Sequence, residues 1–214
     1  MPNARILLRY GRRIASMLIM PREERHAYWN RLRPYLTASL ALFALGLLAG
    51  LMIVYRNPDL ADHLANTLGE FVKMFAGMSR WKLAAAIFLN NSIKTLMAIL
   101  LGTALGIVPG IFLLANGVAL GVALSLSIQT RGLWFSVLSI VPHGALELPA
   151  VFLGTSIGLM LGAQAMNHFI GRSEATLRAE LADGFKFYCT VIVPLLILAA
   201  LVEVFVTAAI VLPR

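Results

Sequence analysis

Seven polar or ionisable side chains interrupt the long apolar stretches of this sequence, and they are its candidates for chemistry. They are Asn90, Asn91, Lys94, Asn116, His143, Glu147 and Glu203. Asn90 and Lys94 are four residues apart, as are His143 and Glu147, so each pair would share one face of a helix. A charged side chain near the centre of a bilayer costs about 2.5–3.5 kcal/mol on translocon scales. We therefore expect these groups to face the inside of a helix bundle and to converge on one another.

Such a cluster supports three interpretations. It could be a structural polar core, in which Lys94 neutralises a glutamate, and His143 and the asparagines satisfy the broken backbone around Pro142. It could be a proton or ion relay in a small transporter or channel, formed by His143, Glu147 and Glu203. It could also be an enzyme site with His143 and Glu147 as metal ligands or as acid and base, but one histidine and two carboxylates are few ligands for a metal. We predict no catalytic residue, no metal and no cofactor.

The composition places the chain in a membrane. Its 214 residues are 59% hydrophobic and only 13% charged, whereas a soluble domain has about 25% charged residues. Cys189 is the single cysteine, so no internal disulfide is expected. Much of the net charge of +8 comes from arginines before residue 34, a placement that favours a membrane surface over nucleic acid as the partner. The first 30 residues do not have the form of a signal peptide.

Five apolar stretches are long enough to cross a bilayer, which predicts an all-α bundle of about five spans. They cover about residues 35–55, 83–107, 110–128, 133–162 and 190–212. Val108, Pro109 and Gly110 alone join the second span to the third, so we expect a tight antiparallel hairpin there.

The fourth stretch is too long for one straight crossing. As a helix it would measure ~45 Å against a hydrocarbon core of ~30 Å. Pro142, Gly144 and Pro149 lie within it, and proline removes a helical hydrogen bond. We predict a break at Pro142–Gly144, with a short half-helix over 133–141 leading into a span from about residue 144.

Surface helices and basic residues complete the expected topology. Amphipathic helices are predicted at 3–20, 58–78 and 164–186, and a basic segment, 1–34, precedes a membrane domain, 35–214. By the positive-inside rule the arginines place the N-terminus in the cytoplasm of a cell membrane. Five crossings put the C-terminus outside; if 133–163 enters and leaves on one side, the C-terminus lies inside.

Two series of glycines recur at every fourth position. They are Gly102, Gly106 and Gly110, and Gly154, Gly158 and Gly162. Glycines at this spacing leave a groove in which another backbone can approach closely. We favour packing between helices of one chain over a dimer interface, and a homo-oligomer stays open.

Four blocks of this sequence resemble a known family. Residues 142–150, Pro-His-Gly-Ala-Leu-Glu-Leu-Pro-Ala, closely resemble the signature of the stage II sporulation protein M family. Residues 88–91, 116–121 and 199–203 resemble further blocks of that family, in its order and spacing, within a match over about residues 35–212. The arginine-rich start lies outside this match.

The resemblance implies an integral membrane protein without enzymatic activity. In spore-forming bacteria the named member of the family is a membrane partner that anchors and organises cell-wall-cleaving enzymes. For this chain it implies recruitment or organisation of membrane or cell-envelope proteins whose identity the sequence does not give. The alternative remains a small transporter or channel, and an intramembrane metal-dependent enzyme is the third interpretation.

Overall fold

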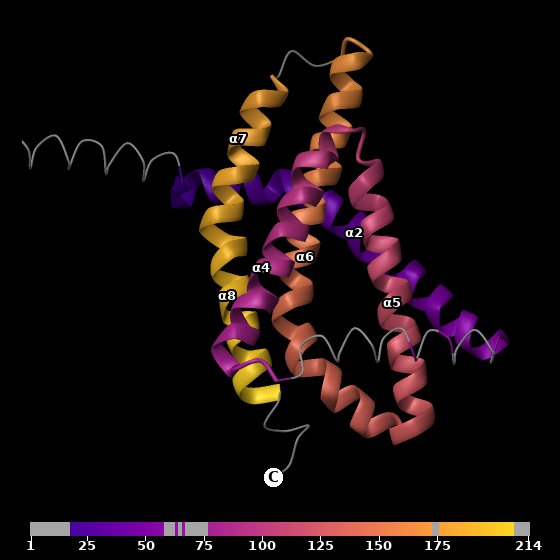
Figure 1. The fold of residues 1–214 in the computed structure, drawn as a ribbon. Coiled ribbons are helices and arrows are strands. Elements are labelled where there is room, and N and C mark those ends of the chain that lie inside the picture. The colour runs from indigo at the N-terminus through magenta and orange to yellow at the C-terminus, as the bar shows by residue number, and fades with distance from the viewer. Residues whose placement is uncertain (1–17, 58–62, 64–65, 67–76, 173–175, 208–214) are drawn as a thin grey trace, which may run out of the picture.

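The computed structural model describes residues 18–57, 63, 66, 77–172 and 176–207, and side chains 139–143, 206 and 207 are outside the described part. Every element described is helical (Figure 1). The elements are α2 (Arg22–Arg56), α4 (Arg80–Leu100), the 3₁₀ turn η1 (Leu101–Thr103), α5 (Ile107–Arg131), α6 (Leu133–Phe169), α7 (Leu177–Phe187), the π-helical turn η2 (Tyr188–Ile192), α8 (Val193–Val202) and the π-helical turn η3 (Glu203–Thr207).

Five helical stretches are long and apolar enough to cross a membrane, which confirms the predicted fold class. They are Arg22–Arg56, Arg80–Thr103, Ile107–Arg131, Gly144–Phe169 and Leu177–Phe205. The connections α4–α5 and α6–α7 lie at one end of the bundle and the connection α5–α6 lies at the other (Figure 1). The arrangement therefore fits five crossings, and the cytoplasmic placement of the N-terminus stays a prediction from the arginines.

The first crossing is longer than predicted. Pro21 precedes α2, and Glu23 and Glu24 occupy its first turn, where the helix dipole favours acids. The helix continues through Pro34 to Arg56, so residues 22–34 of the basic segment and the apolar stretch after them form one helix. Of the three predicted amphipathic helices, 3–20 and 58–78 lie almost wholly outside the described residues, and 164–186 contains the end of α6 and most of α7.

The helix α6 is continuous from Leu133 to Phe169 and runs through Pro142, Gly144 and Pro149. In Figure 1 the first part of α6 lies at a steep angle to the rest. Proline removes one backbone hydrogen bond and kinks a helix without necessarily ending it. The predicted break therefore takes the form of a bend within one helix and not of two separate helices.

The hairpin between α4 and α5 turns earlier in the chain than predicted. Leu105 and Gly106 make the turn, with φ of 57° and 73°. Pro109 is buried in the first turn of α5, a position where a helix tolerates proline because the backbone N–H there has no helical partner. The prediction that Val108, Pro109 and Gly110 form the connection is wrong, since they belong to the helix.

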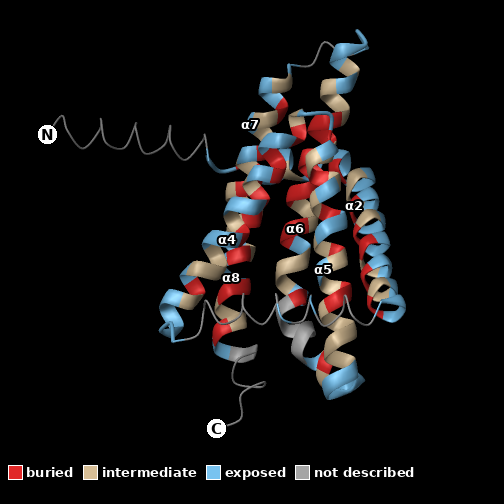
Figure 2. Cartoon of the chain, turned by 45° about the vertical axis from the view of Figure 1, so that its right-hand side comes forward, coloured by how far each residue is buried: buried red, intermediate tan, exposed pale blue. Residues whose placement is uncertain are grey.

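The long helix α6 is the centre of the bundle. In its most apolar stretch 61% of residues are buried, against 28% for α2, α4 and α5. Buried residues face inward on the surrounding helices in Figure 2, and exposed ones cover their outer faces and ends. Side chains on α6 are therefore the ones best placed to meet groups from several helices.

Glycines set the distance between α6 and the α4–η1 segment. A Cβ added to Gly102 would overlap the backbone of Gly158, and one added to Gly162 would overlap the backbone of Gly106. A Cβ on Gly154 would overlap the Thr95 side chain. These contacts of the two glycine series lie within the chain, whereas the nearest atom to a Cβ on Gly110 is a leucine methyl carbon 4.0 Å away.

A second glycine contact, which the sequence analysis did not single out, joins α2 to α5. A Cβ on Gly46 or Gly50 would overlap the backbone of α5, and one on Gly117 or Gly121 would overlap the backbone of α2. Both pairs have the spacing Gly-x-x-x-Gly, which permits close approach of membrane helices.

Gly158→Ala should destabilise the protein, because the new methyl group would overlap the carbonyl oxygen of Ala98. We expect a loss of about 1–3 kcal/mol, as for an overpacked core. Gly110→Ala is the matched control, with room for a methyl group and an expected gain of about 0.5–1 kcal/mol from helix propensity. Thermal unfolding in detergent measures both, and equal effects of the two changes would contradict the packing account.

Candidate functional site

Asn116 and Glu147 are the predicted polar residues that the structure brings to one cavity. The cavity has a volume of about 250 Å³ and lies between α2, α5 and α6, with Phe43 on the α2 side. Both polar side chains are half-buried. Asn116 donates a hydrogen bond of 2.7 Å from Nδ2 to the backbone oxygen of Phe112, one helical turn earlier. An amide and a carboxyl group thus line one cavity of the bundle. The carboxyl group can take up or release a proton, and the two groups together can bind a small polar group.

The polar residues of α4 divide between its two faces. Asn91 is buried, and its Oδ1 accepts a 3.3 Å hydrogen bond from Nδ2 of Asn90. Asn90 and Lys94 are exposed. The expectation that every polar group faces the bundle interior does not hold for these two. The face of α4 and η1 that packs against α6 contains Thr95, Ala98 and Gly102, and the exposed Asn90 and Lys94 lie to one side of it.

The remaining two predicted residues lie on α6 and on the last crossing. Glu203 begins η3, which packs against α4 and α6, and it is half-buried. His143 belongs to α6, and its side chain is outside the described part. No group of three or more His, Cys, Asp or Glu side chains that could hold a metal occurs among the residues that the structure describes.

Hydroxyl groups form buried contacts that the sequence analysis missed. Ser39 of α2 and Ser156 of α6 are fully buried, with 3.0 Å between their Oγ atoms. The Tyr188 hydroxyl donates to the backbone oxygen of Ser92 at 3.0 Å and so links the last crossing to α4. Serine and threonine are common in membrane helices because they can bond to their own helix backbone, so their sequence positions carried no signal.

One string within α6 has the letters of a hydrolase motif but a different geometry. Residues 154–158, Gly-Thr-Ser-Ile-Gly, match the pattern Gly-x-Ser-x-Gly, whose serine sits on a sharp strand-to-helix turn in hydrolases. Here the string lies inside a helix, Ser156 bonds to Ser39 and to the backbone oxygen of Phe152, and Gly154 and Gly158 are packing positions. The geometry assigns Ser156 to packing.

A charged cluster joins the start of α2 to α7. Arg31 forms an ion pair with Glu180 and a second one, at 3.5 Å, with Asp183. Glu180 is buried, and the ring of Tyr28 lies below the Arg31 guanidinium, at 5.2 Å. Lys186 lies 3.6 Å from Asp183 on α7 itself. These contacts fix the polar third of α2 against the beginning of the last crossing.

The Arg31–Glu180 pair should couple more strongly than the Lys186–Asp183 pair. Glu180 is buried, so the pair is screened less than a surface pair, although Arg31 is 45% exposed at its side chain. Double-mutant cycles with Arg31→Met and Glu180→Gln should give a coupling of about 1 kcal/mol or more. The control cycle with Lys186→Met and Asp183→Asn should give about 0.3–0.5 kcal/mol. Equal couplings, from unfolding in detergent, would show that burial of Glu180 adds nothing.

The fold and the site define a class: a five-span helical membrane protein with α6 at its centre and polar groups both inside the bundle and on an outer face. The family described as Stage II sporulation protein M matches residues 39–208. The chain belongs to that family.

One relative comes from Methanocaldococcus jannaschii. It is an uncharacterized protein with 24% identity over 176 residues, an alignment that covers 79% of this chain and 91% of the relative. No solved structure matches the chain.

Proposed function

We propose that this protein is a non-enzymatic membrane component that binds a partner protein inside the bilayer through the outer face of α4. The observation that carries the proposal is the exposure of Lys94 and Asn90 on that face. Partner binding also agrees with what family resemblance implies, namely the recruitment or organisation of membrane or cell-envelope proteins.

The position of Lys94 along α4 makes its exposure costly in lipid. The crossing runs from Arg80 to Thr103, so Lys94 is ~21 Å from its first residue and ~14 Å from its last. The flexible stem carries the ammonium part of the way to the surface, but a lipid-facing lysine at this depth still costs up to about 2.5–3.5 kcal/mol. A protein surface over this face would remove that cost.

The chemistry of the face indicates the kind of partner. Apolar side chains, among them Leu89, Ile93 and Met97, surround the two polar groups and are exposed. A second transmembrane helix fits such a face if it carries an aspartate or glutamate at the depth of Lys94 and a hydrogen-bonding side chain near Asn90. The ion pair between Lys94 and the partner's carboxylate would be stronger than in water because the surroundings have a low dielectric constant.

Photo-crosslinking tests this proposal directly. A photoreactive residue at Met97, on the outer face of α4, should give discrete adducts with one or a few other proteins in cells. The same residue at Leu48, exposed on α2, is the matched control and should give none. Lys94→Met should weaken the Met97 adducts, and Lys94→Arg should preserve them because the positive charge remains.

Three outcomes would contradict the proposal. The first is the same adduct pattern at both positions. The second is an adduct at Met97 with only another copy of this chain, which would make the face a dimer interface. The third is adduct formation unchanged by Lys94→Met.

The cavity beside Glu147 favours a second candidate, a small transporter or channel. Carboxyl groups inside a membrane bundle commonly serve as ion or proton relays, and Glu147 shares its cavity with Asn116. Ion or solute flux in liposomes that hold the purified protein, abolished by Glu147→Gln, would replace the binding proposal with this one.

A further inference from the structure

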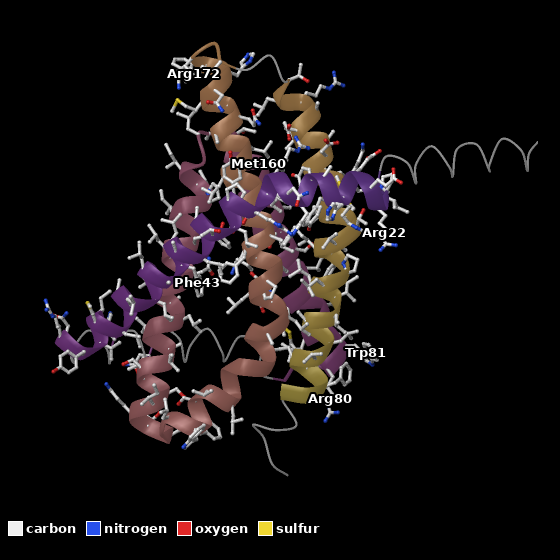
Figure 3. All side chains as sticks on the ribbon, turned by 180° about the vertical axis from the view of Figure 1, so that it is seen from behind. Arg22, Phe43, Arg80, Trp81, Met160 and Arg172 are labelled. Carbon is white, nitrogen blue, oxygen red and sulfur yellow. The ribbon has the colours of Figure 1, made fainter. Side chains whose placement is uncertain are left out.

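A groove of about 1220 Å³ lies between the start of α2 and the last crossing. Arg22, Arg25, His26 and Trp29 line it from α2, and apolar residues of η2 and α8 line the other wall. In Figure 3 Arg22 lies where the start of α2 passes next to the last membrane-spanning stretch, Leu177–Phe205. The groove is distinct from the cavity of Glu147 and from the outer face of α4.

The two walls of the groove differ in chemistry. On the α2 wall two guanidinium groups and an imidazole accompany the carboxylate of Glu23, so the arginines outnumber the acid. The α8 wall consists of aliphatic side chains such as Leu195 and Leu198, and Leu198 is 50% exposed. A ligand that fills both parts therefore needs an anionic group next to an apolar chain.

The groove also lies at the border between polar and apolar sequence. Lys186 is the last charged residue of α7, and residues 187–202 carry no charge. Trp29, half-buried, lines the groove together with the arginines and the aliphatic residues. Tryptophan is enriched at membrane–water interfaces, where one part of the ring is apolar and another is polar. This border is where the phosphate of a lipid would meet its acyl chains.

Hydrogen bonds hold the arginine wall in place. The backbone N–H of Met20 donates to Oγ1 of Thr190 at 2.9 Å, and that hydroxyl donates to the backbone oxygen of Leu18 at 3.2 Å. The ion pairs of Arg31 with α7 fix the same helix three turns further on. The two arginines are thus fixed over the groove by contacts that do not use their own charges.

We propose that this groove binds an anionic phospholipid of the adjoining leaflet, with its phosphate at Arg22 and Arg25 and an acyl chain along the aliphatic wall of α8. Guanidinium groups bind phosphate oxygens with two parallel hydrogen bonds. Basic pockets between transmembrane helices are known to hold anionic head groups. The excess positive charge gives selectivity over zwitterionic lipids.

Tryptophan quenching by brominated lipids tests the proposal. The full chain with Trp81→Phe and Trp134→Phe keeps Trp29 as its only tryptophan. In phosphatidylcholine vesicles, brominated phosphatidylglycerol should bind near Trp29 about fivefold or more tightly than brominated phosphatidylcholine, a ratio that corresponds to a total of about 1 kcal/mol. Arg22→Gln with Arg25→Gln should reduce this ratio to about one, and Arg22→Lys with Arg25→Lys should retain most of it.

Two controls distinguish binding of the anionic lipid in the groove from its general attraction to a positively charged protein. Arg172→Gln removes a charge at the tip of α6, away from the groove (Figure 3), and should leave the ratio unchanged. A chain with Trp81 alone places the reporter between Arg80 and Lys82 at the other end of the bundle. This reporter measures surface attraction to basic residues without the groove, so its ratio should be clearly smaller than that at Trp29.

Three results would overturn the proposal. One is equal quenching of Trp29 by the two lipids in the protein with both arginines. Another is an equal preference at Trp81, which would reveal only bulk attraction. The third is relief of Trp29 quenching by millimolar glycerol phosphate, which would identify a soluble organic phosphate as the ligand.

Discussion

The close approach of helix backbones at glycine positions is the interaction on which the rest of this structure depends. Gly102 meets Gly158 and Gly106 meets Gly162, so one face of the α4–η1 segment is committed to α6. Lys94 lies about 100° around the helix from Thr95, so it borders the face that packs against α6 and is exposed beside it. The glycine contact, and not the cost of polar groups in lipid, therefore decides which way Lys94 points.

This constraint divides the polar residues between two places. Asn116 and Glu147 lie inside, at the cavity between α2, α5 and α6, because the glycines of α2 and α5 bring those helices together beside α6. Asn90 and Lys94 lie outside, on a face that lipid alone would cover poorly. A bundle that is closed within itself and polar on one outer face is suited to binding another membrane protein, which is why we prefer that function.

The sequence predicted the class and the number of crossings but not the orientation of each helix. Apolar stretches separated by polar ones indicate spans through length and hydropathy alone, and the five crossings follow from that. The rotation of α4 depends on which of two competing demands is satisfied, the burial of Lys94 or the fit of Thr95 and Gly102 against α6. The glycine series predicted close packing, but its partner could not be known before the helices were placed. Pro109 misled the hairpin prediction, because proline both ends helices and begins them.

Spin labels at neighbouring positions of α4 would test the central claim most directly. In a Cys189→Ser background, a label at Thr95→Cys should be immobilised and protected from oxygen, because that position faces α6. A label at Lys94→Cys in the purified protein, reconstituted in nanodiscs, should be mobile and accessible to oxygen. A protected label at 94 together with an accessible one at 95 would contradict the account.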